Sequence, residues 1–127
     1  MIFGTHFLIY SENPEADRAF FSDVLEFKAV DAGHGWLIFK LPPAEVAVHP
    51  TDDANREPLR GEGRIAGAEI YLMCDDLQAE MKLLAAKNVK CGPVDEARWG
   101  KKTTFRLPSG GKIGLYQPKH QTALDLK

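Results

Sequence analysis

Two side chains that can bind a metal ion begin two similar segments of the chain. His6 starts the run His-Phe-Leu-Ile-Tyr, and Glu69 starts the run Glu-Ile-Tyr-Leu-Met. A residue that favours the start of a helix follows seven positions later in each segment, Asn13 in the first and Asp76 in the second. The last apolar segment carries Gly114 where a paired site would have a carboxylate. The spacing therefore indicates a duplicated scaffold with a metal-capable side chain in each copy and a gap at Gly114.

The first copy has the pattern of one strand, one helix and three further strands. The side chains of residues 5–11 alternate between two faces, with Phe7 and Ile9 on one and His6, Leu8 and Tyr10 on the other, which predicts a half-buried strand. Asn13, Pro14 and apolar residues at helical spacing predict a helix over 14–25. Residues 27–31 and 36–40 flank a glycine-containing turn and predict a hairpin, and residues 45–49 alternate as a further strand.

The second copy follows a segment of a different composition. Residues 50–67 are rich in Pro, Gly, Asp, Asn and Arg and lack periodicity, so we interpret them as a linker. A strand over 68–74, a helix capped by Asp76 and ended by Asn88, and strands near 89–98, 101–107 and 112–117 are expected after it. The predicted order is β-α-β-β-β, repeated within one domain of 127 residues: module 1 about 5–49, the linker, and module 2 about 68–118.

Composition excludes several classes of function. The formal net charge is −2 and the isoelectric point about 6.1, which disfavours a nucleic-acid partner. The two cysteines, Cys74 and Cys91, are not clustered, as is typical of a reduced intracellular protein. No secretory signal and no apolar run long enough for a membrane span is recognisable. We therefore expect a soluble cytoplasmic protein with no membrane partner.

The chain resembles the vicinal oxygen chelate superfamily, which includes glyoxalases, bleomycin resistance proteins and extradiol dioxygenases. The likeness rests on His6 to Tyr10, on Asn13 to Leu25, on the turn Pro108-Ser-Gly-Gly111 and on Lys112 to Pro118. It implies an α+β fold in which two β-α-β-β-β modules form a curved mixed sheet around an open cup, with helices on the convex side. It also implies a homodimer. Two positions depart from the family: Glu26 replaces the usual glycine after the first helix, and Leu107 the usual aspartate before the turn.

The resemblance also implies where metal ligands would stand. The first position falls on His6, the second on His49 or, alternatively, Glu45, the third on Glu69 and the fourth on Gly114. His6, His49 and Glu69 would form a two-histidine, one-carboxylate set suited to Fe, Mn, Zn or Ni. The incomplete set favours the opposite interpretation, a cup that has lost its metal and needs no cofactor.

Aromatic residues are a second candidate for binding. We expect a pocket for a flat or apolar ligand to draw on five side chains: Tyr10, Trp36, Tyr71, Trp99 and Tyr116. The two tryptophans have an equally good interpretation as packing at a sheet edge.

The late strands are basic. They carry Arg98, Lys101, Lys102, Arg106 and Lys112, which would attract an anionic ligand. Lysines on edge strands more often prevent unwanted strand pairing, and we favour that interpretation.

The predicted function is binding of a small organic molecule in the cup, with a degenerate metal site. The alternative is a divalent-metal-dependent lyase, isomerase or extradiol-type dioxygenase acting on a substrate with vicinal oxygens, in which the metal polarises both oxygens or activates O2. The sequence assigns no catalytic residue.

Overall fold

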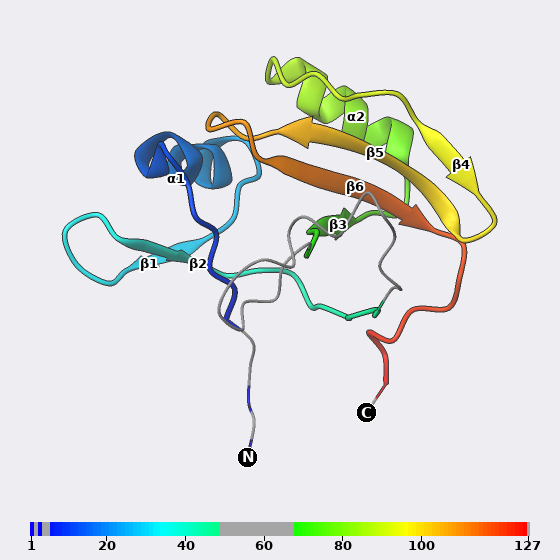
Figure 1. Ribbon diagram of the computed structural model, residues 1–127, viewed down its shortest axis with the longest axis horizontal. Helices are drawn as coiled ribbons and strands as arrows, with labels where there is room; N and C mark the ends of the chain where they lie inside the picture. The colour runs from blue at the N-terminus through cyan, green and yellow to red at the C-terminus, as the bar shows by residue number, and fades with distance from the viewer. Residues whose placement is uncertain (2, 4–5, 49–67, 127) are drawn as a thin grey trace. The chain divides into compact units, whose positions relative to one another are not determined.

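The computed structural model describes residues 1, 3, 6–48 and 68–126, and it divides into two compact units. Unit 1 consists of Met1–Lys40 and Arg106–Lys112, and unit 2 of Leu41–Phe105 and Ile113–Lys127. Figure 1 shows the elements in chain order: α1 (Pro14–Asp23), β1 (Ala29–Asp31), β2 (Leu37–Phe39), β3 (Tyr71–Met73), α2 (Leu77–Ala86), β4 (Asp95–Ala97), β5 (Gly100–Arg106) and β6 (Lys112–Pro118). Among the described residues, no helix is long and apolar enough to cross a membrane.

In unit 1, helix α1 begins as the sequence predicts. The Asn13 side chain accepts a hydrogen bond of 3.3 Å from the Ala16 amide, and Pro14 occupies the first turn, where its missing N–H costs nothing. After the helix the chain turns at Glu26, whose φ of 59° lies in the left-handed region. The family's glycine at this position therefore has a conformational reason, and Glu26 adopts the same turn with a side chain.

Strands β1 and β2 form the predicted antiparallel hairpin of unit 1, with Ala29 opposite Phe39. Gly33, His34 and Gly35 all have positive φ at the turn. Apolar contacts come from Phe21 of α1, whose ring lies 5.4 Å from that of Phe39.

A polar contact ties α1 to the turn between β5 and β6, within unit 1. Asp17 is buried, and its carboxylate accepts hydrogen bonds from the Ser109 amide (3.0 Å) and the Ser109 hydroxyl (2.6 Å). The neighbouring Leu107 is buried and pairs its amide with the Gly111 carbonyl at 2.8 Å. Leucine instead of the family's aspartate therefore supplies core packing at this turn.

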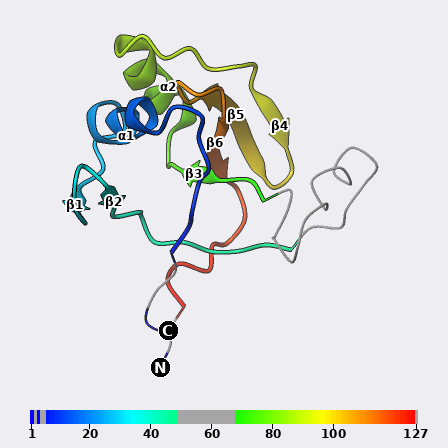
Figure 2. The same cartoon turned by 60° about the vertical axis from the view of Figure 1, so that its left-hand side comes forward.

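Unit 2 is built around an open sheet in the order β3-β6-β5-β4. Strand β3 runs parallel to β6, and β4 runs antiparallel to β5. Helix α2 starts at Asp76, whose side chain accepts from the Ala79 amide at 3.1 Å. It covers one face of this sheet (Figures 1 and 2), and Gln117 of β6 accepts a 2.9 Å hydrogen bond from the Leu77 amide at the helix start.

The core of unit 2 lies between α2 and that face. Its buried apolar side chains are Leu77, Leu84, Phe105, Ile113 and Leu115. Because side chains alternate along a strand, the residues between them on β5 and β6 point to the opposite face. Lys102 and Tyr116 therefore belong to the face that α2 leaves uncovered.

The α+β class with a mixed, open sheet is confirmed, and the second copy has the predicted order β-α-β-β-β. Both helix caps and the left-handed Asn88 after α2, with a φ of 64°, are also confirmed. The prediction of strands over 5–11 and 45–49 is wrong for their described residues, 6–11 and 45–48, which belong to no strand. Alternation of side chains alone does not make a strand, because a strand also requires regular backbone pairing with a neighbour. His49 and the predicted linker 50–67 lie outside the described residues.

Candidate ligand-binding site

Three aromatic rings lie on the face of the unit 2 sheet that α2 does not cover, and the middle one, Tyr116, contacts the other two. The ring of Tyr116, on β6, lies edge-to-face 6.0 Å from that of Tyr71 on β3 and 5.6 Å from that of Trp99 before β5. Tyr71 and Tyr116 are half-buried, and Trp99 is 42% exposed. We call Tyr71, Trp99 and Tyr116 the aromatic cluster. Edge-to-face contacts favour fixed orientations of the rings, and part of Trp99 stays accessible.

Gly114 determines where Tyr71 lies. The two residues face each other across the parallel pair β3–β6. A Cβ built on Gly114 would overlap the Tyr71 ring and would lie 2.9 Å from its Cγ. The position where the family usually has a carboxylate is therefore filled by an aromatic ring, and only glycine leaves room for it.

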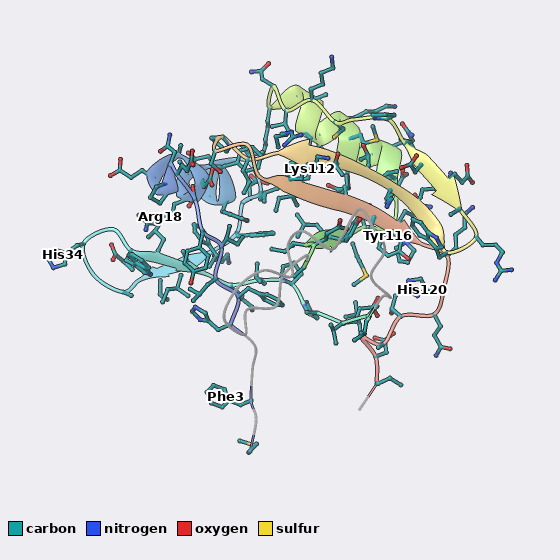
Figure 3. All side chains as sticks on the ribbon, in the orientation of Figure 1. Phe3, Arg18, His34, Lys112, Tyr116 and His120 are labelled. Carbon is teal, nitrogen blue, oxygen red and sulfur yellow. The ribbon has the colours of Figure 1, made fainter. Side chains whose placement is uncertain are left out.

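A second glycine lies beside Tyr116. Gly100 is buried with a φ of 155°, and a Cβ there would overlap the Gln117 carbonyl oxygen and would lie 2.7 Å from Cε2 of Tyr116. The Tyr116 hydroxyl donates a 3.1 Å hydrogen bond to the Trp99 carbonyl, which fixes the ring against this turn. Figure 3 labels Tyr116 and His120, whose rings are 5.7 Å apart. Burial raises the pKa of the Tyr116 hydroxyl, and the negative charge of Glu45 adds to the effect.

Among the described residues, the Lys102 side chain places a positive charge at the aromatic cluster. The Lys102 ammonium is 5.4 Å from the centroid of Trp99 and 5.7 Å from that of Tyr71, within cation–π range of both. Its Nζ also donates a 3.5 Å hydrogen bond to the Tyr71 hydroxyl.

The Tyr71 hydroxyl in turn donates to Glu69 Oε2 at 2.7 Å. Burial is the largest cause that raises the pKa of Tyr71, to about 12, and the hydrogen bond to Glu69 and the charges of Glu69 and Asp95 act in the same direction. Tyr71 is therefore a neutral donor to Glu69 and an acceptor for Lys102 at physiological pH.

The other two predicted aromatic residues belong to unit 1. Tyr10 is 76% exposed and Trp36 58% exposed. The Arg18 guanidinium lies 4.9 Å from the Trp36 ring, and Figure 3 labels Arg18 near the hairpin. Of the five predicted ligand-binding residues, the structure thus brings Tyr71, Trp99 and Tyr116 into contact.

The predicted metal ligands are distributed between the units. His6 is an exposed residue of unit 1, whereas Glu45 and Glu69 belong to unit 2. Glu45 accepts a 2.7 Å hydrogen bond from the Ala123 amide, and Glu69 is bonded to Tyr71. Within the part of the chain that the structure describes, no three His, Cys, Asp or Glu side chains are grouped so as to hold a metal ion. The metal-free interpretation stays a prediction, because His49 lies outside the described residues.

Sequence reasoning named Lys102 only as one of the basic residues of the late strands and favoured an edge-strand role for it, and it missed His120. Lys102 is in β5, an inner strand between β6 and β4, so the interpretation as an edge-strand lysine does not apply to it. Its alternation with the buried Thr103 and Phe105 was the available signal, since it places Lys102 opposite the core. No sequence signal pointed to His120, which follows β6.

Comparison with known proteins identifies the fold. No protein-family model matches the chain, and no curated protein matches its sequence. TnmS3, an antibiotic binding protein from Streptomyces sp. CB03234, is 24% identical, with a TM-score of 0.63 over 94% of this chain and 99% of that one. A lactoylglutathione lyase from Agrobacterium tumefaciens is 16% identical, with a TM-score of 0.59 over 86% and 88% of the two chains.

A third structure agrees with both. A member of the glyoxalase/bleomycin resistance protein/dioxygenase superfamily from Sphaerobacter thermophilus DSM 20745 is 23% identical, with a TM-score of 0.56 over 91% of this chain and 98% of that one. The chain therefore has the fold of this superfamily, the vicinal oxygen chelate fold, as the resemblance in its sequence implied.

Proposed function

We propose that the protein binds a small, flat organic molecule against the aromatic cluster, with no metal ion at the site. The observation that carries this proposal is the Tyr71 ring over Gly114. It replaces a carboxylate position with apolar surface and places Tyr71 in contact with Tyr116, which contacts Trp99.

The chemistry of the cluster supports a flat occupant. Exposed edges and faces of half-buried rings favour offset or edge-to-face contacts with another π-system, worth about 0.5–1.5 kcal/mol per ring pair beyond the buried area. The hydroxyls of Tyr71 and Tyr116 are already donors to Glu69 and to the Trp99 carbonyl. Recognition at this cluster would therefore rest on ring contacts rather than on tyrosine O–H donation.

The similarity to TnmS3, which is described as an antibiotic binding protein, is consistent with a binding role. The similarity to a lactoylglutathione lyase keeps the metal-dependent enzyme as the alternative. A role in chemistry would need a complete ligand set, and the fold by itself does not supply one.

Calorimetry with 7-methoxycoumarin as a flat neutral probe tests the proposal, with cyclohexylmethanol as a probe that cannot stack. We expect Trp99→Ala to weaken coumarin binding about tenfold, which corresponds to roughly 1.4 kcal/mol. Trp36→Ala is the matched control, because it removes the other tryptophan, in unit 1, and should leave the affinity unchanged.

Two results would contradict the proposal. One is equal binding of both probes, or an equal loss in the two tryptophan variants. The other is stoichiometric binding of Mn(II), Zn(II) or Ni(II) that is lost in His6→Ala, which would favour the metal-dependent enzyme.

A further inference from the structure

Lys102 is the one charged side chain that lies against two rings of the aromatic cluster in the described part of the chain. It is half-buried, because its strand β5 has β6 on one side and β4 on the other. Its Nζ has three donors, and its only hydrogen bond to a described residue is the long one, 3.5 Å, to the Tyr71 hydroxyl.

The Lys102 ammonium has no ion-pair partner among the described residues. The contrast with Lys119 is direct: the Lys119 ammonium pairs with Glu96 at 2.8 Å, although both of those side chains are well exposed. A charge that is partly removed from water usually has a counter-charge or several hydrogen bonds. Lys102 therefore retains donors for an incoming acceptor.

Two carboxylates lie in the same region, but neither forms an ion pair with the Lys102 ammonium. Asp95 faces Lys102 across the β4–β5 pair, and Glu69 accepts from Tyr71; both are exposed. Their charges are more strongly screened by water than that of half-buried Lys102. A cationic ligand would also find the faces of Trp99 and Tyr71 already next to an ammonium, whereas an acidic group would meet free N–H donors.

We propose that the ligand is a flat aromatic molecule with an acidic oxygen, a phenolate or a carboxylate, which binds the Lys102 ammonium while its ring contacts the aromatic cluster. This inference rests on the proposed function, since it assumes that a flat ring binds the aromatic cluster and adds where the acidic group of that molecule lies. Tyr71 donates to Glu69, so Lys102 is the donor to the ligand and Tyr71 orients the ammonium.

The probe for this inference is 7-hydroxycoumarin, a flat phenol that titrates near neutral pH and whose neutral and anionic forms absorb at different wavelengths. Bound next to an ammonium, its phenolate is favoured, so its apparent pKa should fall by about one unit on binding to the wild-type protein. Lys102→Met should abolish this shift and weaken the anionic form about tenfold, as expected for a charge-assisted hydrogen bond.

Lys101→Met is the matched control. Lys101 is the neighbour of Lys102 on β5 and alternates to the other face, so this variant makes the same change in net charge without touching the cluster. It should bind 7-hydroxycoumarin as the wild type does. The methoxy analogue, which cannot ionise, should bind Lys102→Met and the wild type alike.

The outcomes separate the two proposals. If 7-methoxycoumarin binds but the bound phenol keeps or raises its pKa, or if Lys101→Met and Lys102→Met behave alike, the role of Lys102 is overturned while the aromatic site stands. Stronger binding of 7-aminomethylcoumarin, a cation, than of 7-hydroxycoumarin would overturn it too. If no coumarin binds, the proposed function fails, and the inference falls with it.

Discussion

Segment 6–10 and strand β3 hold corresponding places in the two copies of the repeat, yet of the two only β3 is a strand. Tyr71, Leu72 and Met73 pair with Gly114, Leu115 and Tyr116 of β6 and are all half-buried. The side chains of Phe7, Leu8, Ile9 and Tyr10 are 45–76% exposed, and their residues are in no strand. Similar alternation thus has two outcomes, because strand formation depends on backbone pairing as well as on alternation of side chains.

The helices of the two copies differ in the residue that ends them. Each is followed by a residue in the left-handed region, Glu26 after α1 and Asn88 after α2. Asparagine adopts this conformation at little cost, whereas a residue such as glutamate is strained in it. The second copy therefore has the better helix ending as well as the paired strand, and each difference can be tested by substitution.

The largest effect is expected at Gly114. Gly114→Ala places a methyl group against the Tyr71 ring, so β3 or the ring must move, at a cost of about 2 kcal/mol in the free energy of unfolding. Binding of 7-methoxycoumarin should weaken with it. Chemical denaturation and calorimetry measure the two effects.

Gly92→Ala is the matched control for Gly114→Ala, because its Cβ would lie 3.5 Å from the Thr104 hydroxyl, an ordinary contact. In a Tyr71→Ala background, Gly114→Ala should lower the free energy of unfolding only slightly, since the ring that the new methyl group would displace is absent. An equal cost in both backgrounds would show that Gly114 is needed for another reason.

The next effect concerns the polar contact that ties α1 in the first copy. Asp17→Ala removes the acceptor of two hydrogen bonds from Ser109 and should lower the free energy of unfolding by about 2 kcal/mol. Burial acts to raise the pKa of Asp17, but hydrogen bonds from Ser109 and Ser11 outweigh it, and the net pKa lies below 3.8.

The lowered pKa of Asp17 determines how the stability of the fold depends on pH. A carboxyl group whose pKa is lowered in the folded state stabilises the fold fully above its unfolded pKa, and the contribution is lost as the pH falls through the folded pKa. Denaturation curves should therefore show a smaller loss of stability on acidification in Asp17→Ala than in the wild type. The exposed first-turn variant Glu15→Gln is the control, and an identical acid profile for Asp17→Ala would contradict the expectation.

The third prediction concerns segment 6–10 itself. We propose a homodimer, in which exposed apolar side chains such as Leu8 lie at the contact between chains, and native mass spectrometry should then give twice the chain mass of 14.1 kDa. Leu8→Asp should weaken the dimer about tenfold or more, because a charge in an apolar contact is left unpaired. Leu83→Asp on α2 is the control, since Leu83 is 60% exposed and Leu8 66%. Detection of only monomeric wild-type protein throughout the micromolar range would contradict the proposed homodimer.

The features that could be predicted from sequence are the local ones. Asn13 and Asp76 cap their helices through side chains that reach three residues ahead, so their role can be read from neighbouring residues. Strand pairing is not local: whether residues 6–10 form a strand, and the inner position of Lys102 in its sheet, depend on which strands lie side by side. The sequence shows that Gly114 has no side chain to bind a metal ion. Only the register that pairs Tyr71 with Gly114 shows that the Tyr71 ring occupies the space beside it.

A smaller effect is expected at the end of α1. Glu26→Gly should raise the free energy of unfolding by about 0.5–1 kcal/mol, because relief of the left-handed strain exceeds the entropy that glycine adds to the unfolded chain. Asn88→Gly is the corresponding change in the second copy, and it should give a smaller gain in the free energy of unfolding. Thermal denaturation measures both, and a larger gain at Asn88 than at Glu26 would reverse the ranking of the two helix endings.

The smallest effect concerns the hydrogen bond between Tyr71 and Glu69, which has no counterpart among the described residues of the first copy. Burial, and after it the hydrogen bond to Glu69 and the charge of Glu69, raise the pKa of Tyr71 to about 12, so a spectrophotometric titration should show Tyr71 ionising well above pH 10. Glu69→Gln removes the negative charge that opposes ionisation, and the pKa of Tyr71 should move back toward 10.0 by a fraction of a unit, since burial, the larger cause, remains. A phenol that holds its proton more tightly when folded favours the fold below its unfolded pKa, and this contribution declines as the pH rises toward the folded value. Glu80→Gln on α2 is the control for the change in net charge. An unchanged titration of Tyr71 in Glu69→Gln would mean that Glu69 has no part in raising the pKa of Tyr71, and the position of the ring would then rest on Gly114 rather than on Glu69.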